Sequence, residues 1–201
     1  ANVAILNATD IIGFTATSGT SNAGTATFNL KAGGVRTLDL SSATGAGSFI
    51  LKGNSGKDSI TGTAGADTIN AGAGADIITI GTAGHGNSDT IDGGDDADVL
   101  QLSTGAHAFA DNNKLQNVET VKTHSSGSEV SLANQTEAFA ITGGDGVDII
   151  TGGDGVDTIN TGAGADIITI GTACHGYSGA NRDLDAAPAL QSSTRAHAFA
   201  D

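Results

Sequence analysis

The chain has 201 residues and a formal net charge of −14, from 22 acidic against 8 basic residues; 31 residues are glycine and aromatic residues make up only 3%. No basic patch is present to neutralise phosphates, so this composition excludes nucleic acids and anionic membranes as partners and is compatible with cations. The single cysteine, Cys174, excludes an intramolecular disulfide, and the lack of an apolar run of about 18 residues argues against membrane insertion.

Residues 1–52 contain short β-strand candidates, VAIL, TATFNL, VRTLDLS and SFILK, separated by Gly, Ser, Asn and Thr. They predict a β-rich spacer or the start of a solenoid. The chain has no initiator Met and opens in strand-like sequence. We therefore read it as a mature product or as a piece of something longer.

A nine-residue repeat begins after this segment. The first block, 53–101, reads GNSGKDSIT, GTAGADTIN and AGAGADIIT, then the four extra residues IGTA at 80–83, then GHGNSDTID and GGDDADVLQ. The second block, 143–173, reads GGDGVDIIT, GGDGVDTIN and TGAGADIIT, followed by IGTA again. Repetition at fixed spacing predicts one structural unit for each repeat.

Between the blocks lies a spacer, 102–142, in which NVETVKT and SEVSL alternate apolar and polar residues and predict further strands. Its best helix candidate, 106–117, is expected to be a loop or a single turn. Residues 67–86 and 157–176 differ at only two of twenty positions, which indicates a tandem duplication with a period of ninety. Residues 174–201 form a degenerate repeat tail.

The nonamer has the pattern G-G-x-G-x-D-x-U-x, where U is a large apolar residue. Glycines permit positive φ, so six residues can form a tight turn and the other three a short strand with U pointing inward. Two nonamers make one coil of about 18 residues, and stacking places the acids of every second repeat about 4.8 Å apart. Asp76 should therefore lie over Asp58. Stacked carboxylates repel one another, and exposed turn carbonyls add oxygen ligands, so the pattern predicts Ca²⁺ between turns.

GGDGVDIIT and GGDGVDTIN resemble the RTX nonapeptide, the calcium-binding β-roll motif of secreted bacterial proteins. The resemblance implies an all-β fold, a parallel β-roll or β-solenoid with β-rich spacers, that binds several Ca²⁺ ions. It implies that the sixth-position acids are calcium ligands: Asp58, Asp67, Asp76, Asp89, Asp98, Asp148, Asp157 and Asp166. It also implies ligand carbonyls from turn glycines: Gly53, Gly62, Gly93, Gly94, Gly143, Gly144, Gly152 and Gly153.

Two departures from the pattern have structural consequences. The IGTA insertion is expected to bulge out or to interrupt the regular coil, in both copies. In the tail, Gly179 stands where Asp89 stood and Pro188 where Asp98 stood. The tail is therefore expected to be less ordered, and Asp157 to lack a partner one coil later.

Other polar residues have simpler interpretations. The third-position acids are expected to be solvated, with an assisting role left open: Asp95, Asp145 and Asp154. The four duplicated histidines could form a transition-metal site, but no Cys or second His lies at ligand spacing: His85, His107, His175 and His197. Outward-facing T-x-N stripes, at 68–70 and 158–160, resemble ice-binding solenoids, although only two copies occur.

No HExxH or GxSxG motif and no nucleophile with a base is present, so we expect no catalytic residues and no enzyme. The resemblance to bacterial surface-layer and large RTX surface proteins implies a calcium-dependent structural module on the bacterial cell surface. It would fold on binding Ca²⁺ and assemble with copies of itself into a layer or filament, with cell-surface polysaccharide as another partner class left open. Two alternatives remain: the secretion and folding region of a secreted hydrolase or toxin, and an adhesin or ice-binding solenoid.

Overall fold

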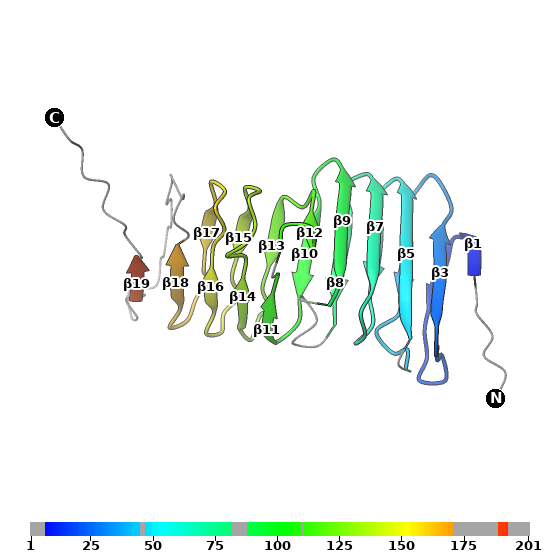
Figure 1. Ribbon diagram of the computed structural model, residues 1–201, viewed down its shortest axis with the longest axis horizontal. Coiled ribbons are helices and arrows are strands. Elements are labelled where there is room, and N and C mark those ends of the chain that lie inside the picture. Colours follow the sequence, from blue (N-terminus) through cyan, green and yellow to red (C-terminus); the bar gives the residue numbers. More distant parts are fainter. Residues whose placement is uncertain (1–6, 45–46, 82–87, 110, 171–188, 193–201) are drawn as a thin grey trace.

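The computed structural model is an elongated β-solenoid whose strands lie across its long axis, with β1 and β19 at opposite ends (Figure 1). It describes residues 7–44, 47–81, 88–109, 111–170 and 189–192. All strand pairings among these residues are parallel. The same residues contain no helix, and so none long and apolar enough to cross a bilayer. The predicted all-β parallel solenoid is confirmed.

The strands form three sheets, numbered here 1 to 3. Sheet 1 contains β1 (Asn7–Ile11), β3 (Thr25–Leu30), β5 (Ser48–Ser55), β7 (Thr68–Ala73), β9 (Thr90–Asp95) and β12 (Leu115–Gln116). Sheet 2 contains β2 (Gly13–Thr15), β4 (Arg36–Asp39), β6 (Asp58–Thr61), β8 (Ile77–Ile80), β10 (Val99–Leu102), β13 (Thr120–Lys122), β15 (Ala140–Thr142) and β17 (Thr158–Asn160). Sheet 3 contains β11 (Gly105–Ala108), β14 (Ser128–Ser131), β16 (Ile149–Thr151), β18 (Ile167–Ile170) and β19 (Ala189–Ser192).

The core consists of ladders of inward apolar side chains, as the U position of the nonamer predicts. Along sheet 2 one buried ladder contains Leu38, Ile60, Ile78, Leu100, Val121, Ile141 and Ile159, each in register with the next. Because side chains alternate along a strand, the neighbours of these residues point outward, and the inward side chains, with Phe28, Phe109 and Phe139 the largest, fill the core. The ladder crosses both spacers, so 7–44 and 102–142 continue the same solenoid as the nonamer blocks.

The strands on either side of the IGTA insertion keep their register, so of the two predicted outcomes an interruption of the coil is wrong; Thr82 and Ala83 lie outside the described residues. Before the insertion, Ile60 pairs with Ile78, and acids one coil apart are separated by 18 residues. Across the insertion, Ile80 pairs with Leu102 and the separation grows to 22 residues, with the register kept. Ile80 itself is buried in the core. In the second copy, β18 still pairs with β19, the only described part of the tail; Gly179 and Pro188 lie outside the described residues.

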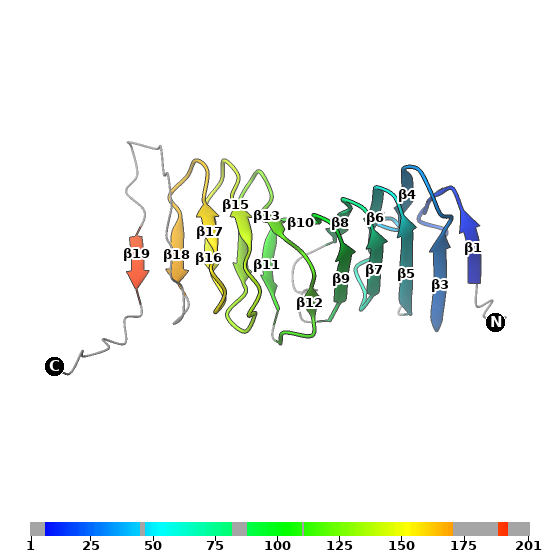
Figure 2. The same cartoon turned by 90° about the horizontal axis from the view of Figure 1, so that it is seen from above.

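The spacer changes the cross-section of the solenoid. The chain passes through sheets 1, 2 and 3 in turn at β9, β10 and β11, and again at β12, β13 and β14 (Figure 2). The segment 106–117, expected to be a loop or a single turn, contributes strands β11 and β12 to these coils. Its strands pair with neighbouring coils, a non-local contact that single-sequence periodicity does not reveal.

Candidate functional site

All eight predicted acids occupy the same place in the fold, at the end of a glycine-rich turn and the start of a strand. Their exposed fractions are 3% or less. Strands of sheet 1 follow Asp67 and Asp89, and strands of sheet 3 follow Asp148 and Asp166. Strands of sheet 2 begin at or directly after the other four: Asp58, Asp76, Asp98 and Asp157. The structure therefore brings them together in rows along the edges of the solenoid. Buried carboxylates are rare unless they are paired or bind a cation.

Acids in successive coils are joined by a backbone-to-carboxylate hydrogen bond. The N–H of Asp58 donates to Oδ1 of Asp76 at 2.6 Å, and the N–H of Asp76 donates to Oδ1 of Asp98 at 2.8 Å. The N–H of Asp148 likewise donates to Asp166 at 2.9 Å. The predicted stacking of Asp76 over Asp58 is confirmed. These N–H groups partly offset the like-charge repulsion, which the sequence pattern alone did not indicate.

The second carboxylate oxygen distinguishes two kinds of turn. In one kind it accepts the N–H of the residue four positions earlier, as in Asn54 to Asp58 at 3.1 Å and Gly153 to Asp157 at 3.0 Å. In the other kind Oδ2 is buried and has no hydrogen-bond partner; this is the case for Asp76, Asp98 and Asp166. The residue four positions earlier is then a glycine with positive φ: Gly72, Gly94 or Gly162. Orphaned buried carboxylate oxygens fit a site built for a cation.

Burial and neighbouring acids make the charged form of these groups unfavourable. Burial, the larger cause, together with the charges of Asp98 and Asp58, raises the pKa of Asp76 to about 6, although the Asp58 N–H opposes the rise. Burial raises the pKa of Asp89 to about 7 and, with nearby acids, that of Asp98 to about 6. A bound divalent cation would stabilise the carboxylate form of each group.

The predicted turn glycines bring backbone oxygens up to the acids. A Cβ on Gly93 would lie 2.0 Å from the carbonyl oxygen of Asn117 and 2.6 Å from Oδ2 of Asp98. A Cβ on Gly53 would lie 1.9 Å from the Ala71 oxygen and 2.9 Å from Oδ2 of Asp58. A Cβ would also lie within 2.5 Å of a carbonyl oxygen of a neighbouring coil at four more glycines: Gly94, Gly143, Gly144 and Gly153. At Gly62 and Gly152 its nearest neighbour would be the carboxylate of the acid in the same turn.

Carbonyl oxygens are needed in any such site. In the part of the chain that the structure describes, no three His, Cys, Asp or Glu side chains come close enough together to hold a metal ion. Ca²⁺ takes six to eight oxygens and accepts backbone carbonyls as well as carboxylates, so the residues present fit that ion. The ligand role of each named acid and glycine stays a prediction.

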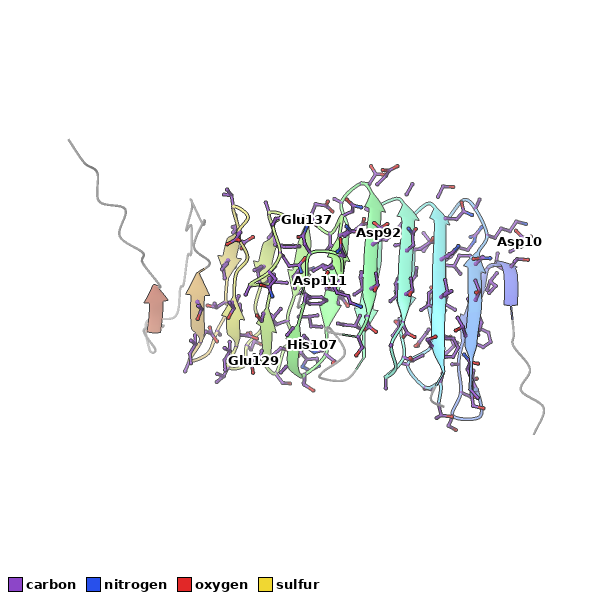
Figure 3. All side chains as sticks on the ribbon, viewed as in Figure 1. Asp10, Asp92, His107, Asp111, Glu129 and Glu137 are labelled. Carbon is purple, nitrogen blue, oxygen red and sulfur yellow. The ribbon has the colours of Figure 1, made fainter. Side chains whose placement is uncertain are left out.

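The third-position acids and the duplicated histidines lie apart from the acid rows where the structure describes them. The third-position acids Asp95, Asp145 and Asp154 are exposed. His107 is fully buried in β11, where it is the inward register partner of Val130 and its Nε2 lies 3.0 Å from the Ser103 carbonyl oxygen, so it is a core residue (Figure 3). The other three duplicated histidines, His85, His175 and His197, lie outside the described residues.

Sequence reasoning missed Glu119. It lies in the spacer, where no nonamer exists, yet it continues the sheet 2 row: the N–H of Asp98 donates to its Oε2 at 2.7 Å. Asp98 and Glu119 immediately precede the register partners Val99 and Thr120. In the sequence, the only sign of this relation is that an acid stands directly before a strand-like segment.

Comparison with known families matches these coils. Residues 50–82, 83–106 and 141–169 match the family model described as RTX calcium-binding nonapeptide repeat (4 copies). The three segments contain all eight acids placed above. No match was found among curated proteins or among solved structures. The chain therefore contains RTX-type calcium-binding nonapeptide repeats, which make up these three segments of the solenoid.

Proposed function

We propose that this protein is a calcium-dependent structural module that works outside the cell, at the bacterial surface, and assembles with copies of itself. The observation that carries the proposal is the set of buried acid rows with orphaned oxygens inside RTX-matched coils. The matched family is a calcium-binding repeat and not a catalytic one. The module would act by folding into a solenoid and by joining other copies through the ends of that solenoid.

The acids and glycines would couple folding to calcium. Asp76 and Asp98 would hold the ion through oxygens that have no protein partner, and the glycine turns admit carbonyl oxygens beside them. When bound, Ca²⁺ supplies positive charge that offsets the stacked carboxylates. Without it, the buried acids oppose closure of the core, and chain entropy favours the open chain. Since extracellular calcium is abundant, the chain would fold after export.

The ends of the solenoid support self-assembly. Among the described residues, β2 and β17 are the terminal strands of the eight-stranded sheet 2, and β1 is a terminal strand of sheet 1. A terminal strand has one row of backbone N–H and C=O groups that pairs with no strand of its own sheet, and such edges accept another chain. Because the coils stack along one axis, copies joined end to end would extend the same solenoid into a filament or layer.

The first test is circular dichroism of the 201-residue chain in excess chelator and in millimolar calcium. We expect β content to appear only with calcium. Equal β content in both conditions would contradict the proposal. Magnesium at the same concentration is the control, because Mg²⁺ demands a smaller octahedral site.

A surface-layer role and the alternatives differ in assembly. Electron microscopy with and without calcium should show ordered layers or filaments only with calcium, whereas monodisperse particles in both conditions would favour a secretion and folding region of a larger hydrolase or toxin. The ice-binding alternative has less support: Thr68 and Asn70 lie on sheet 1, but Thr158 and Asn160 lie on sheet 2, so the two T-x-N copies share no plane.

A further inference from the structure

Glu119 has the register position of a nonamer acid, although it lies in the spacer, outside the RTX-matched segments, and unlike those acids is exposed. Its Oε2 accepts the N–H of Asp98 at 2.7 Å, the same link that joins Asp58 to Asp76 at 2.6 Å. Its own backbone is in the ladder on both sides: the N–H of Thr120 bonds the Asp98 carbonyl, and the N–H of Ala140 bonds the Glu119 carbonyl. The row ends there, because the next coil has Phe139 in this position.

The coil below Glu119 contains one buried carboxylate oxygen that lacks a partner. Asp98 is fully buried and its Oδ2 accepts no hydrogen bond. The Asn117 carbonyl oxygen and Asp98 Oδ2 border the same space beside Gly93, within 2.0 and 2.6 Å of the point where a Cβ would stand. Gly53 has a similar pair of neighbours inside the first block, the Ala71 carbonyl oxygen and Oδ2 of Asp58, although there Oδ2 accepts the N–H of Asn54.

From these contacts we infer that the spacer completes the last calcium site of the first block, with the Glu119 carboxylate and the Asn117 carbonyl as ligands beside Asp98. The set is oxygen-only and combines two carboxylates with a backbone carbonyl, which is the chemistry that Ca²⁺ prefers. The inference rests on the proposed calcium binding. It assigns a ligand to a segment that has no repeat motif, and it joins the spacer to the block through an ion.

The test is calcium titration of the full chain by isothermal calorimetry, comparing Glu119→Gln with the parent. Glutamine keeps an oxygen that can accept the Asp98 N–H but removes the charge. We expect one calcium equivalent to be lost, or its Kd to rise about tenfold. Glu129→Gln is the matched control: Glu129 is exposed on β14 in sheet 3, away from the row, and should leave the titration unchanged (Figure 3). Asp98→Asn should lose the same equivalent as Glu119→Gln.

Stability separates a ligand from a structural cap. For a ligand, Glu119→Gln lowers the thermal midpoint at limiting calcium, and the deficit shrinks as the calcium concentration rises; for a cap, any change in midpoint is the same at all calcium concentrations at which the chain folds. If Glu119→Gln binds calcium as the parent does and only Glu119→Ala weakens the fold, Glu119 is a cap and the inference is overturned. If the parent binds no calcium at all, the proposed function fails first, and the inference fails with it. Circular dichroism in saturating calcium checks that each variant folds.

Discussion

At the scale of single residues, seven of the eight repeat acids accept a backbone N–H from the preceding coil and so join two coils before any ion is bound. One oxygen of Asp76 accepts the backbone N–H of Asp58, and the other faces a buried space without a partner. The first oxygen explains why an acid recurs at this position, since its side chain reaches the N–H of the coil beneath it. The second oxygen explains why the protein needs a cation, because a desolvated carboxylate is unfavourable when it is left unpaired.

The raised pKa values predict that metal-free folding depends on pH in an unusual direction. Burial raises the pKa of Asp89 to about 7 and those of Asp76 and Asp98 to about 6, above the ordinary value of 3.8. The stabilisation these groups contribute is therefore present below about pH 4 and is lost as pH rises through 6 to 7. In chelator, β content should rise as pH falls from 7.5 to 5.

Circular dichroism in EDTA across this pH range measures the effect. Calcium reverses the dependence, since the ion competes with protons for the same oxygens: calcium affinity should fall as pH drops below about 6, within the range of the raised pKa values. A metal-free chain with more β structure at pH 7.5 than at pH 5 would show that the buried acids do not oppose folding.

At the scale of turns and strands, the sequence predicted the nonamer repeats well and the non-repeating spacer only in part. The nine-residue phase was enough to place the turns, the inward Ile60, Ile69 and Ile78, and the stacking of Asp76 over Asp58. The strands of the spacer were predicted only in part, because β11 and β12 are fixed by pairing with neighbouring coils and carry no repeat. Whether IGTA interrupts the solenoid depends on whether the strands on either side of it keep their register. That register is set by pairing with the next coil, which the insertion itself does not reveal.

Glycine in the second turn position is required by both conformation and space, and Gly94 is the clearest case. Its φ is +104°, and a Cβ would lie 1.8 Å from the Gly72 carbonyl oxygen of the adjacent coil. We predict that Gly94→Ala lowers the free energy of unfolding in calcium by roughly 1–3 kcal/mol, the range for a strained backbone position. Urea denaturation in saturating calcium measures it.

Gly24→Ala is the control for Gly94→Ala. Gly24 has no positive φ, and no atom lies within 4 Å of the point where its Cβ would stand, so alanine should be tolerated there. Equal stability of the two variants would mean that the turn at Gly94 can relax away from the adjacent coil, and that the close approach of backbones is not what selects glycine.

At the scale of the whole molecule, duplicated sequence does not occupy duplicated positions. The strand TIN at 68–70 lies in sheet 1, and its copy at 158–160 lies in sheet 2; IITI at 77–80 lies in sheet 2, and its copy at 167–170 lies in sheet 3. The spacer coils, which use all three sheets, shift the second block by one face. A sequence period of ninety could not show this, because the shift depends on how many strands each spacer coil contains.

The ends of the solenoid give the last prediction, on assembly. The N–H of Ala16 bonds the Asp39 carbonyl in the neighbouring strand, at 2.7 Å. Donors alternate in direction along a strand, so the N–H of Thr15 points away from β4, toward the open edge of sheet 2. Thr15→Pro removes this donor without removing a ladder bond. We expect it to suppress calcium-dependent self-association in sedimentation velocity experiments while the calcium-induced dichroism is kept.

Thr15→Ala, which keeps the N–H, should associate like the parent. If Thr15→Pro associates as strongly as Thr15→Ala, copies do not join through this edge, and assembly must use another surface.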